Sequence, residues 1–255
     1  MIDPVLLSIG GLQIRYYGIL YALAFIIGLY IAKKLSRHFN ISESLVEDYI
    51  PYIIIADIVG ARLFEFLFYD PYYYFSHPLK IFAVWEGGLA SHGAIIAIIL
   101  TTYYFCKKNK VNVLNFLDLI SIPVALGAAF IRIGNFINSE LVGKISSVPW
   151  AVKFNGYEGL RHPVQLYQAL GHVFIFFILL IVLFNYKNRK TGFIFFSMLL
   201  LDSVFRFVTE FYKDLPFDYG FFYLNMNLAQ WFSIFIGMIC LIFIVRILKN
   251  WSSSL

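Results

Sequence analysis

Seven apolar runs, each close to the length of a membrane-spanning helix, constrain what this chain can fold into more than any other feature. They cover residues of about 16–32, 45–69, 87–106, 113–131, 164–186, 192–212 and 227–248. A helix needs about 20 residues to cross the ~30 Å hydrocarbon core of a bilayer. The chain is 60% hydrophobic and only 14% charged, against roughly 25% charged residues in a soluble domain. We therefore predict an all-α polytopic membrane protein, with seven transmembrane helices in a single integral membrane domain over residues 1–255.

The basic residues between the runs predict the orientation of the chain in the lipid bilayer. With seven spans, one side receives clustered Lys and Arg residues: Lys33, Lys34, Arg37, Lys107, Lys108, Lys110, Lys187, Arg189, Lys190, Arg246 and Lys249. The other side receives scattered ones: Arg15, Lys80, Lys144, Lys153, Arg161 and Lys213. Lys and Arg in short loops favour the cytoplasm, so we expect the N-terminus outside and the C-terminus in the cytoplasm. These clusters also explain the net charge of +5 without the continuous basic stripe that nucleic-acid binding needs.

The segment 139–162 is the longest non-apolar part of the chain, and three glycines interrupt it. In the predicted orientation it lies outside, so we expect a small extracytoplasmic head there. Residues 1–12 lack the basic region of a cleavable signal peptide. Cys106 and Cys240 match no zinc or redox spacing, so we expect neither a metal site nor a catalytic thiol.

A polar cluster follows the fourth apolar run, between Phe130 and Gly143. Four side chains that hydrogen-bond or carry charge fall within nine residues: Arg132, Asn135, Asn138 and Glu140. An unpartnered polar group in hydrocarbon costs roughly 2–7 kcal/mol, so a bare membrane helix would not carry them. In a helix, a spacing of three residues would place Arg132, Asn135 and Asn138 on one face. The cluster either caps the helix toward the lipid headgroups or forms a site that holds a ligand.

Ionisable residues inside the apolar runs are a second sign of function, because a charge at mid-helix costs about 2.5–3.5 kcal/mol on insertion scales. In the sixth run Asp202, Arg206 and Glu210 are spaced four residues apart and share a helix face. They form either a self-neutralising stripe or an arginine that carboxylates hold in place to bind an anionic headgroup. The second run carries three more: Asp57, Arg62 and Glu65. The last two are three residues apart, and a structural ion pair explains them as well as a functional role does.

The outer ends of the first and third runs hold further candidates. The third run opens with Glu86-Gly-Gly-Leu-Ala-Ser-His92-Gly93, and glycines at the start of a helix expose amide groups that suit a phosphate. His92 is either a structural hydrogen-bonding residue or a base. Tyr17 lies near the outer end of the first run, where an aromatic belt is the ordinary explanation. Arginine suits phosphate through its bidentate fork, and three arginines would face one anion in the outer half of the membrane: Arg132, Arg161 and Arg206.

The segment Arg132–Gly143 reads Arg-x-Gly-Asn-Phe-x-Asn-x-Glu-x-x-Gly. This pattern closely resembles the signature of the phosphatidylglycerol–prolipoprotein diacylglyceryl transferase family. The similarity covers nearly the whole chain and includes residues 3–18, Gly-Gly-Leu-x-x-His-Gly at 87–93, Arg161-His-Pro-x-Gln-Leu-Tyr167 and Arg206-x-x-x-Glu210. It implies seven membrane helices with a small periplasmic head, in the cytoplasmic (inner) membrane, with the active site toward the outer leaflet. That fold agrees with the topology derived from charge.

The resemblance also implies a reaction and the residues that carry it. A diacylglyceryl group moves from phosphatidylglycerol to the thiol of the lipobox cysteine in a prolipoprotein signal peptide, which forms a thioether and releases glycerol phosphate. The reaction needs no cofactor. The residues assigned to catalysis are His92, Arg132, Arg206, Glu210 and Tyr17. The residues that the resemblance assigns to substrate binding are Asn135, Glu140 and Gly143. To these the polar cluster, the arginines and the glycines described above add Asn138, Arg161 and Gly93.

Four of the five catalytic residues have an expected task in this reaction. We expect Arg132 and Arg206 to stabilise the departing phosphate, because its negative charge grows as the C–O bond breaks. Glu210 is expected to orient Arg206. His92 is the candidate base for the thiol, with bulk water or the lipid phosphate as alternatives.

The sequence departs from the family pattern without losing a signature residue. The departures are Ile131 and Ser139 for glycine, Gln168 for Glu, Asp202 for Tyr, and Phe64-Glu65 for Gly-Tyr.

The alternative function is a transporter or flippase for an anionic lipid or organic anion, which intramembrane charges also suit. That class is expected to show related halves or a polar route to the cytoplasmic side. The sequence shows no repeat, and only Asp57 extends the charges inward. A non-catalytic scaffold would leave the polar cluster without a purpose.

Overall fold

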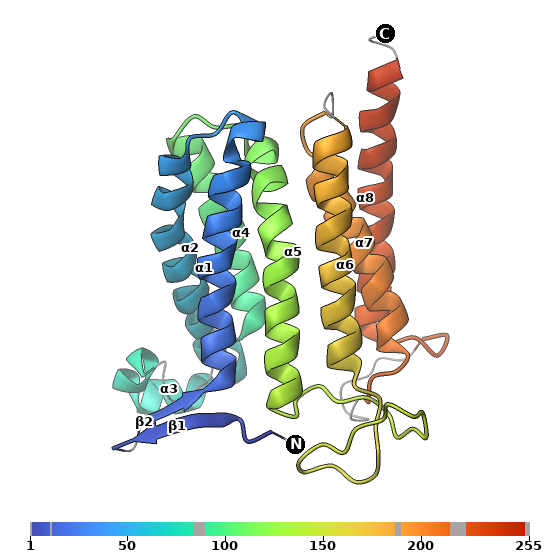
Figure 1. Cartoon of the computed structure of the whole chain (residues 1–255). Coiled ribbons are helices and arrows are strands. Elements are labelled where there is room, and N and C mark those ends of the chain that lie inside the picture. The colour runs from blue at the N-terminus through green and yellow to red at the C-terminus, as the bar shows by residue number, and fades with distance from the viewer. Residues whose placement is uncertain (1, 11, 84–89, 187–189, 215–222, 253–255) are drawn as a thin grey trace. The chain divides into compact units, whose positions relative to one another are not determined.

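The computed structural model describes residues 2–10, 12–83, 90–186, 190–214 and 223–252. Within them the chain forms these strands and helices in order (Figure 1): β1 (Val5–Ile9), β2 (Leu12–Arg15), α1 (Tyr16–Ser36), α2 (Glu43–Phe64), α3 (Pro71–Ser76), α4 (Ser91–Lys108), α5 (Val113–Ile137), α6 (Val164–Asn185), α7 (Phe193–Glu210) and α8 (Leu228–Ser252). A π-helical turn (Glu65–Tyr69) continues α2, and 3-10 turns occupy Arg37–Phe39 and Pro78–Phe82. In the described residues each predicted apolar run overlaps one long helix.

Four of these helices are long and apolar enough to cross a membrane. They are Tyr16–Phe39, which is α1 with its 3-10 turn, and α5, α6 and α8. The other long helices are more polar: α7, for example, carries Asp202, Arg206 and Glu210 within its 18 residues. Apolar helices of this length identify an integral membrane protein. Charged groups on a more polar membrane helix need partners inside the protein or in a polar cavity.

A β-hairpin precedes α1, so the all-α prediction was wrong for the N-terminus. Strands β1 and β2 pair antiparallel, with Leu7 opposite Ile14 and Ile9 opposite Leu12. Gly10 has a φ of 53° at the turn, a conformation that glycine adopts without a steric penalty. Two consecutive glycines between two short apolar stretches of the sequence are typical of a hairpin. The prediction rested on long apolar runs and did not include this pattern.

The chain divides into two units, which are described separately. One comprises residues 33–116 with α2, α3 and α4. The other comprises residues 1–32 and 117–255, with the hairpin, most of α1 and α5, and α6 to α8. In this second unit α7 packs against both α6 and α8 (Figure 1).

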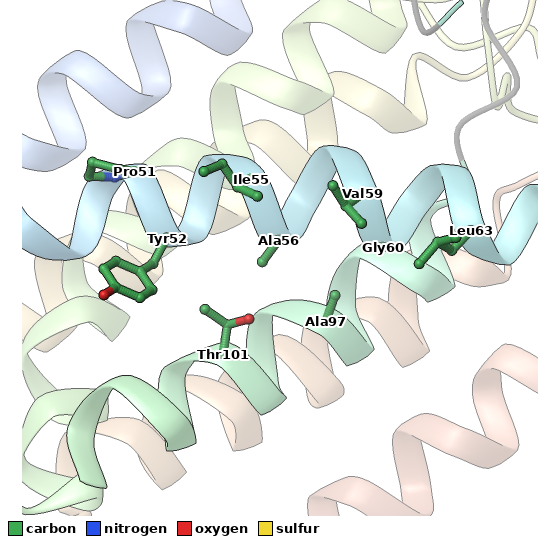
Figure 2. A pocket seen from close by; sticks show the side chains of 9 residues that line it. All are labelled: Pro51, Tyr52, Ile55, Ala56, Val59, Gly60, Leu63, Ala97 and Thr101. Carbon is green, nitrogen blue, oxygen red and sulfur yellow. The ribbon is translucent and has the colours of Figure 1, made fainter. Parts of the chain in front are cut away.

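In the unit of residues 33–116, α2 and α4 cross at two glycines. A Cβ atom on Gly93 would lie 2.2 Å from the carbonyl oxygen of Gly60, and one on Gly60 would lie 2.3 Å from the Ala97 Cβ. Figure 2 shows Ala97 and Thr101 of α4 pointing toward Ala56 and Gly60 of α2. Real Cβ contacts do not approach this closely, so the crossing requires glycine at both positions.

An open groove of about 490 Å³ runs along the same two helices (Figure 2). Its walls carry apolar side chains, and its polar groups are the hydroxyls of Tyr52 and Thr101. Such a lining offers no acid, base or anion-binding group. The groove therefore does not supply the chemistry that the sequence predicts.

Arg62 of α2 holds the loop that follows α3. Its guanidinium donates to the backbone carbonyl oxygens of Lys80, Ile81 and Ala83 at 2.6–2.9 Å and to the Tyr74 hydroxyl at 2.9 Å. The side chain is buried. These contacts favour the structural explanation for this intramembrane arginine.

In the other unit, Asp118 of α5 anchors the start of α7. Its carboxylate oxygens accept hydrogen bonds from the backbone N–H groups of Gly192 (2.6 Å) and Phe195 (2.7 Å). The first N–H groups of a helix have no partner within the helix itself. A side chain from a neighbouring helix thus caps α7 and fixes the position of its polar face.

Asp118→Asn is expected to weaken this cap, because an amide accepts one of the two bonds and places its NH₂ group against the other N–H. The expected loss of stability is about 1–2 kcal/mol, as for other helix caps. Thermal unfolding of the purified protein in detergent measures it. Asn115→Ala, three residues earlier on α5, is the matched control and is expected to lower the midpoint less.

Candidate active site

The predicted polar cluster forms a continuous hydrogen-bonded chain at the end of α5. Arg132 Nη1 donates to Asn135 Oδ1 at 3.4 Å, and Asn135 Nδ2 donates to Glu140 Oε2 at 2.8 Å. Asn138 Nδ2 donates to the other Glu140 oxygen at 3.0 Å. The helix ends at Ile137, so Asn138 lies just beyond the face that Arg132 and Asn135 share. The Glu140 carboxylate therefore binds both asparagines of the cluster. Among the described residues, Arg132 joins the cluster through one long hydrogen bond.

The predicted stripe on α7 is not self-neutralising. Asp202 pairs with His172 of α6 at 3.0 Å, and Glu210 pairs with Lys213 at 3.3 Å. In the described part of the chain, no hydrogen bond or ion pair joins the Arg206 guanidinium to a protein group. Glu210 thus has a partner other than the arginine that we expected it to orient. The acids on either side of Arg206 leave its donors available.

Arg132 and Arg206 share one electrostatic environment. The charges of Arg206, Asp202 and Glu210 on α7 and the hydroxyl of Tyr17 on α1 all act on the Arg132 guanidinium of α5. Two like charges held near each other in a medium of low dielectric constant repel strongly. An anion between them removes that repulsion and gains hydrogen bonds from both. The arrangement therefore suits a phosphate.

Three buried oxygen atoms near this cluster accept no hydrogen bond from the described residues. They are Asn138 Oδ1, Gln165 Oε1 and Glu210 Oε2. Gln165 is joined to the cluster because its Nε2 donates to the Glu140 carbonyl oxygen at 2.5 Å. Buried acceptors without donors are rare and call for an explanation. A ligand with hydroxyl or N–H donors would supply what they lack.

Tyr17 packs on α5 beside the cluster, as well as on its neighbour Tyr21 with ring centroids 6.4 Å apart. A Cβ atom on Gly134 would lie 2.6 Å from Tyr17 Cδ2. The glycine of the signature thus makes room for the tyrosine ring. This contact, together with the interaction with Arg132, places Tyr17 at the site, which an aromatic belt alone does not explain.

Gly134→Ala is expected to displace the Tyr17 ring, because the added methyl group would overlap it. A residue misplaced by about 1 Å can lower a rate by up to ~10²-fold, so we expect activity to fall by at least about tenfold. Activity per milligram of folded protein measures this. Gly127→Ala is the control, since its Cβ would make an ordinary 3.6 Å contact with Ala24; an equal loss in that variant would contradict the packing explanation.

Arg161 and Gly143 lie in the segment 138–163, between α5 and α6. Arg161 is buried and donates to the carbonyl oxygens of Glu158 (3.0 Å) and Gly143 (3.1 Å) and to the carboxylate of Asp214. A Cβ on Gly143 would lie 2.3 Å from the His162 carbonyl oxygen. Both residues were predicted to bind substrate. Their contacts instead favour a scaffold role that shapes the segment next to Glu140.

Comparison with known proteins decides the family. A family model described as prolipoprotein diacylglyceryl transferase matches residues 4–246. The chain belongs to this family. A phosphatidylglycerol–prolipoprotein diacylglyceryl transferase of Tolumonas auensis is 38% identical over 91% of this chain and 90% of its own length. Proteins of the same name from Campylobacter lari (36% identical, 97% and 96% covered) and Chloroherpeton thalassium (38%, 91% and 87%) are also similar.

Family membership confirms the resemblance that the signature at Arg132–Gly143 indicated. The chain is a transferase of lipoprotein biosynthesis and an integral membrane protein. This transferase carries two further predicted residues, His92 and Gly93, in the unit of residues 33–116. The His92 side chain and the glycines at 87 and 88 lie outside the described residues, and Gly93 packs against Gly60.

The residues of the candidate site also contact residues to which the sequence analysis assigned no role. Gln165, His172 and Lys213 contact Glu140, Asp202 and Glu210 respectively. A signal existed for the first two, because a polar side chain in an apolar membrane run marks function by default. The pairing itself needed the crossing of α6 and α7, which the sequence does not show.

Proposed function

We propose that this transferase moves the diacylglyceryl group of phosphatidylglycerol to the thiol of the lipobox cysteine in a prolipoprotein signal peptide. The observation that carries this proposal is the pair of arginines, Arg132 and Arg206, which share one electrostatic environment and have donors that no described residue accepts from. The names of the relatives specify the same lipid and acceptor class. A thioether forms and glycerol phosphate leaves.

The reaction is a displacement at the glycerol carbon that bears the phosphate ester. The sulfur lone pair forms the S–C bond while the C–O bond breaks and its electrons pass to the phosphate oxygen. Charge on the phosphate increases as the bond lengthens, so cations at fixed positions stabilise the transition state more than the ground state. Arg132 and Arg206 supply these cations, each with several N–H donors.

The unsatisfied acceptors give the site a way to recognise the lipid headgroup. Glycerol hydroxyls are donors, and Asn138 Oδ1, Gln165 Oε1 and Glu210 Oε2 are buried acceptors without one in the described chain. A headgroup hydroxyl that meets one of these oxygens removes a desolvation cost of about 1–3 kcal/mol. Asn135 and Glu140 order the loop that presents Asn138.

The thiol must lose its proton, since the nucleophile is the thiolate and a free cysteine has a pKa near 8.5. His92 is the candidate base, as its place in the family element indicates. Bulk water and the lipid phosphate are the alternatives. Comparing His92→Gln with the native chain distinguishes them, because a base contributes about 10²-fold or more to the rate and a loss of only a few-fold would assign His92 to structure.

The topology proposed for this function has seven transmembrane helices in the inner membrane. The clustered basic residues place the N-terminus outside and the C-terminus in the cytoplasm. Segment 139–162 then forms the extracytoplasmic head, and the end of α5 with Arg132 faces the outer leaflet. Phosphatidylglycerol would reach the arginines from that leaflet.

The test is direct chemistry with the purified full-length protein. Incubation with phosphatidylglycerol and a lipobox peptide should give a peptide heavier by one diacylglyceryl group, detected by mass spectrometry. A peptide with serine in place of the lipobox cysteine is the control and should stay unmodified. Absence of the adduct together with lipid movement across vesicle membranes would favour the transporter alternative, which the family assignment does not favour.

A further inference from the structure

A second polar pair lies beside the two arginines, between α6 and α7. His172 Nε2 is 3.0 Å from Asp202 Oδ1, and His172 Nδ1 is 2.7 Å from the backbone carbonyl oxygen of Gln168. The side chain of His172 is 14% exposed and that of Asp202 is 40% exposed. Asp202 interacts electrostatically with His172, Arg206 and Arg132. The pair therefore belongs to the environment of the candidate phosphate site.

Two hydrogen-bond acceptors lie against the His172 ring. A carbonyl oxygen and a carboxylate both accept hydrogen bonds, whereas a neutral imidazole donates from only one nitrogen. An imidazolium donates from both nitrogens and satisfies both partners. The His172 ring thus holds the Asp202 carboxylate toward α6.

Asp202 has a second possible partner on its own helix. Arg206 follows it by four residues, the spacing at which acidic and basic side chains pair along a helix. In the described chain Asp202 nevertheless pairs with α6, and Arg206 has neither a hydrogen bond nor an ion pair through its guanidinium. The His172 ring and the Arg206 guanidinium compete for one carboxylate, and the His172 ring holds it.

We propose that His172 is a positioning residue that keeps Asp202 away from Arg206, so that the Arg206 guanidinium stays available to the phosphate of the lipid. This inference rests on the proposed function. Without the His172 ring, the Asp202 carboxylate would turn to Arg206 and occupy the donors that the phosphate needs. Binding of the lipid would then compete with an internal ion pair.

The test compares His172→Leu, Asp202→Asn and the double variant, as full-length proteins, in the peptide assay with varied phosphatidylglycerol. His172→Leu is expected to raise the KM for the lipid by about tenfold, because charged hydrogen bonds to Arg206 must first be broken. Asp202→Asn removes the competing charge, so its KM should be about tenfold lower than that of His172→Leu. The double variant should share the lower value.

Two further variants separate positioning from structure. Gln168→Leu removes another contact between the same helices, from Gln168 Nε2 to Thr209 Oγ1 at 3.2 Å, and should leave the KM unchanged. His172→Gln keeps a donor for Asp202 without the charge, and its KM should also rise; it serves if His172→Leu fails to fold. Folded yield and thermal midpoint are measured for every variant.

The outcomes distinguish this inference from the function on which it rests. A purely structural pair would suffer equally from the loss of either member, in folded yield and thermal midpoint, while the KM of the folded fraction stayed constant. Equal KM values for His172→Leu and Asp202→Asn, or a double variant no better than His172→Leu, would overturn the positioning role. A native chain that transfers no diacylglyceryl group would overturn the proposed function instead.

Discussion

Replacing Arg132 with alanine is expected to lower thioether formation by about 10²–10³-fold, the usual effect of removing one transition-state donor. The guanidinium donates one long hydrogen bond, of 3.4 Å, to Asn135 and is affected by the charge of Arg206. Within the described residues its other donors bind no protein acceptor, so they are available to the leaving phosphate. The rate of adduct formation at saturating lipid, per folded molecule, is the quantity to measure.

Two variants make this result specific. Arg132→Lys keeps the charge but loses the bidentate fork, so it should retain more activity than alanine and less than the native chain. Arg246→Ala removes an exposed arginine near the end of α8 and should be close to normal. If Arg132→Ala keeps more than about a tenth of the native rate, the phosphate is held by other groups and the mechanism given above is wrong.

Gly93→Ala is expected to have the largest effect on stability. Its new Cβ would lie 2.2 Å from the Gly60 carbonyl oxygen and 2.3 Å from the Phe64 Cβ. Neither is the flexible end of a side chain, so α2 and α4 must separate. Overpacking of this kind costs typically 1–3 kcal/mol and occasionally more, and backbone contact places this variant near the upper end, at about 3 kcal/mol. Folded yield and the thermal unfolding midpoint report it.

The same variant tests whether Gly93 binds substrate. Gly237→Ala is the control, because its Cβ would make an ordinary 3.6 Å contact with the Ser203 Cβ and should be tolerated. A packing role predicts a low yield of Gly93→Ala with near-normal activity in the fraction that folds. Normal yield with abolished activity would return Gly93 to the list of ligand-binding positions.

The long helices could be predicted because the length of the apolar runs and the spacing of polar residues within them are visible in the sequence. Runs of about twenty apolar residues allow one solution in a bilayer, because only a helix satisfies every backbone group within the segment. The polar face of Arg132 and Asn135 followed from the helical repeat. The hairpin was not predicted, because its two strands, Val5–Ile9 and Leu12–Arg15, are much shorter than a membrane-spanning helix.

Pairing between helices was the part that sequence reasoning could not reach. Spacing showed that Asp202, Arg206 and Glu210 share a face, and it suggested that they neutralise one another. The structure gives the two acids other partners, His172 and Lys213. The choice depends on which residues of α6 and of the chain after α7 come within 3–4 Å, and a one-dimensional pattern does not contain that distance.

No linker residue separates the hairpin from the first long helix. Strand β2 ends at Arg15, α1 begins at Tyr16, and the Tyr16 N–H donates to the Pro4 carbonyl oxygen at 3.1 Å. Each residue added at that joint would rotate everything beyond it by about 100° and shift it by about 1.5 Å. The hairpin therefore sets both the position of Tyr17 along the α1 axis and the direction in which its side chain leaves that helix.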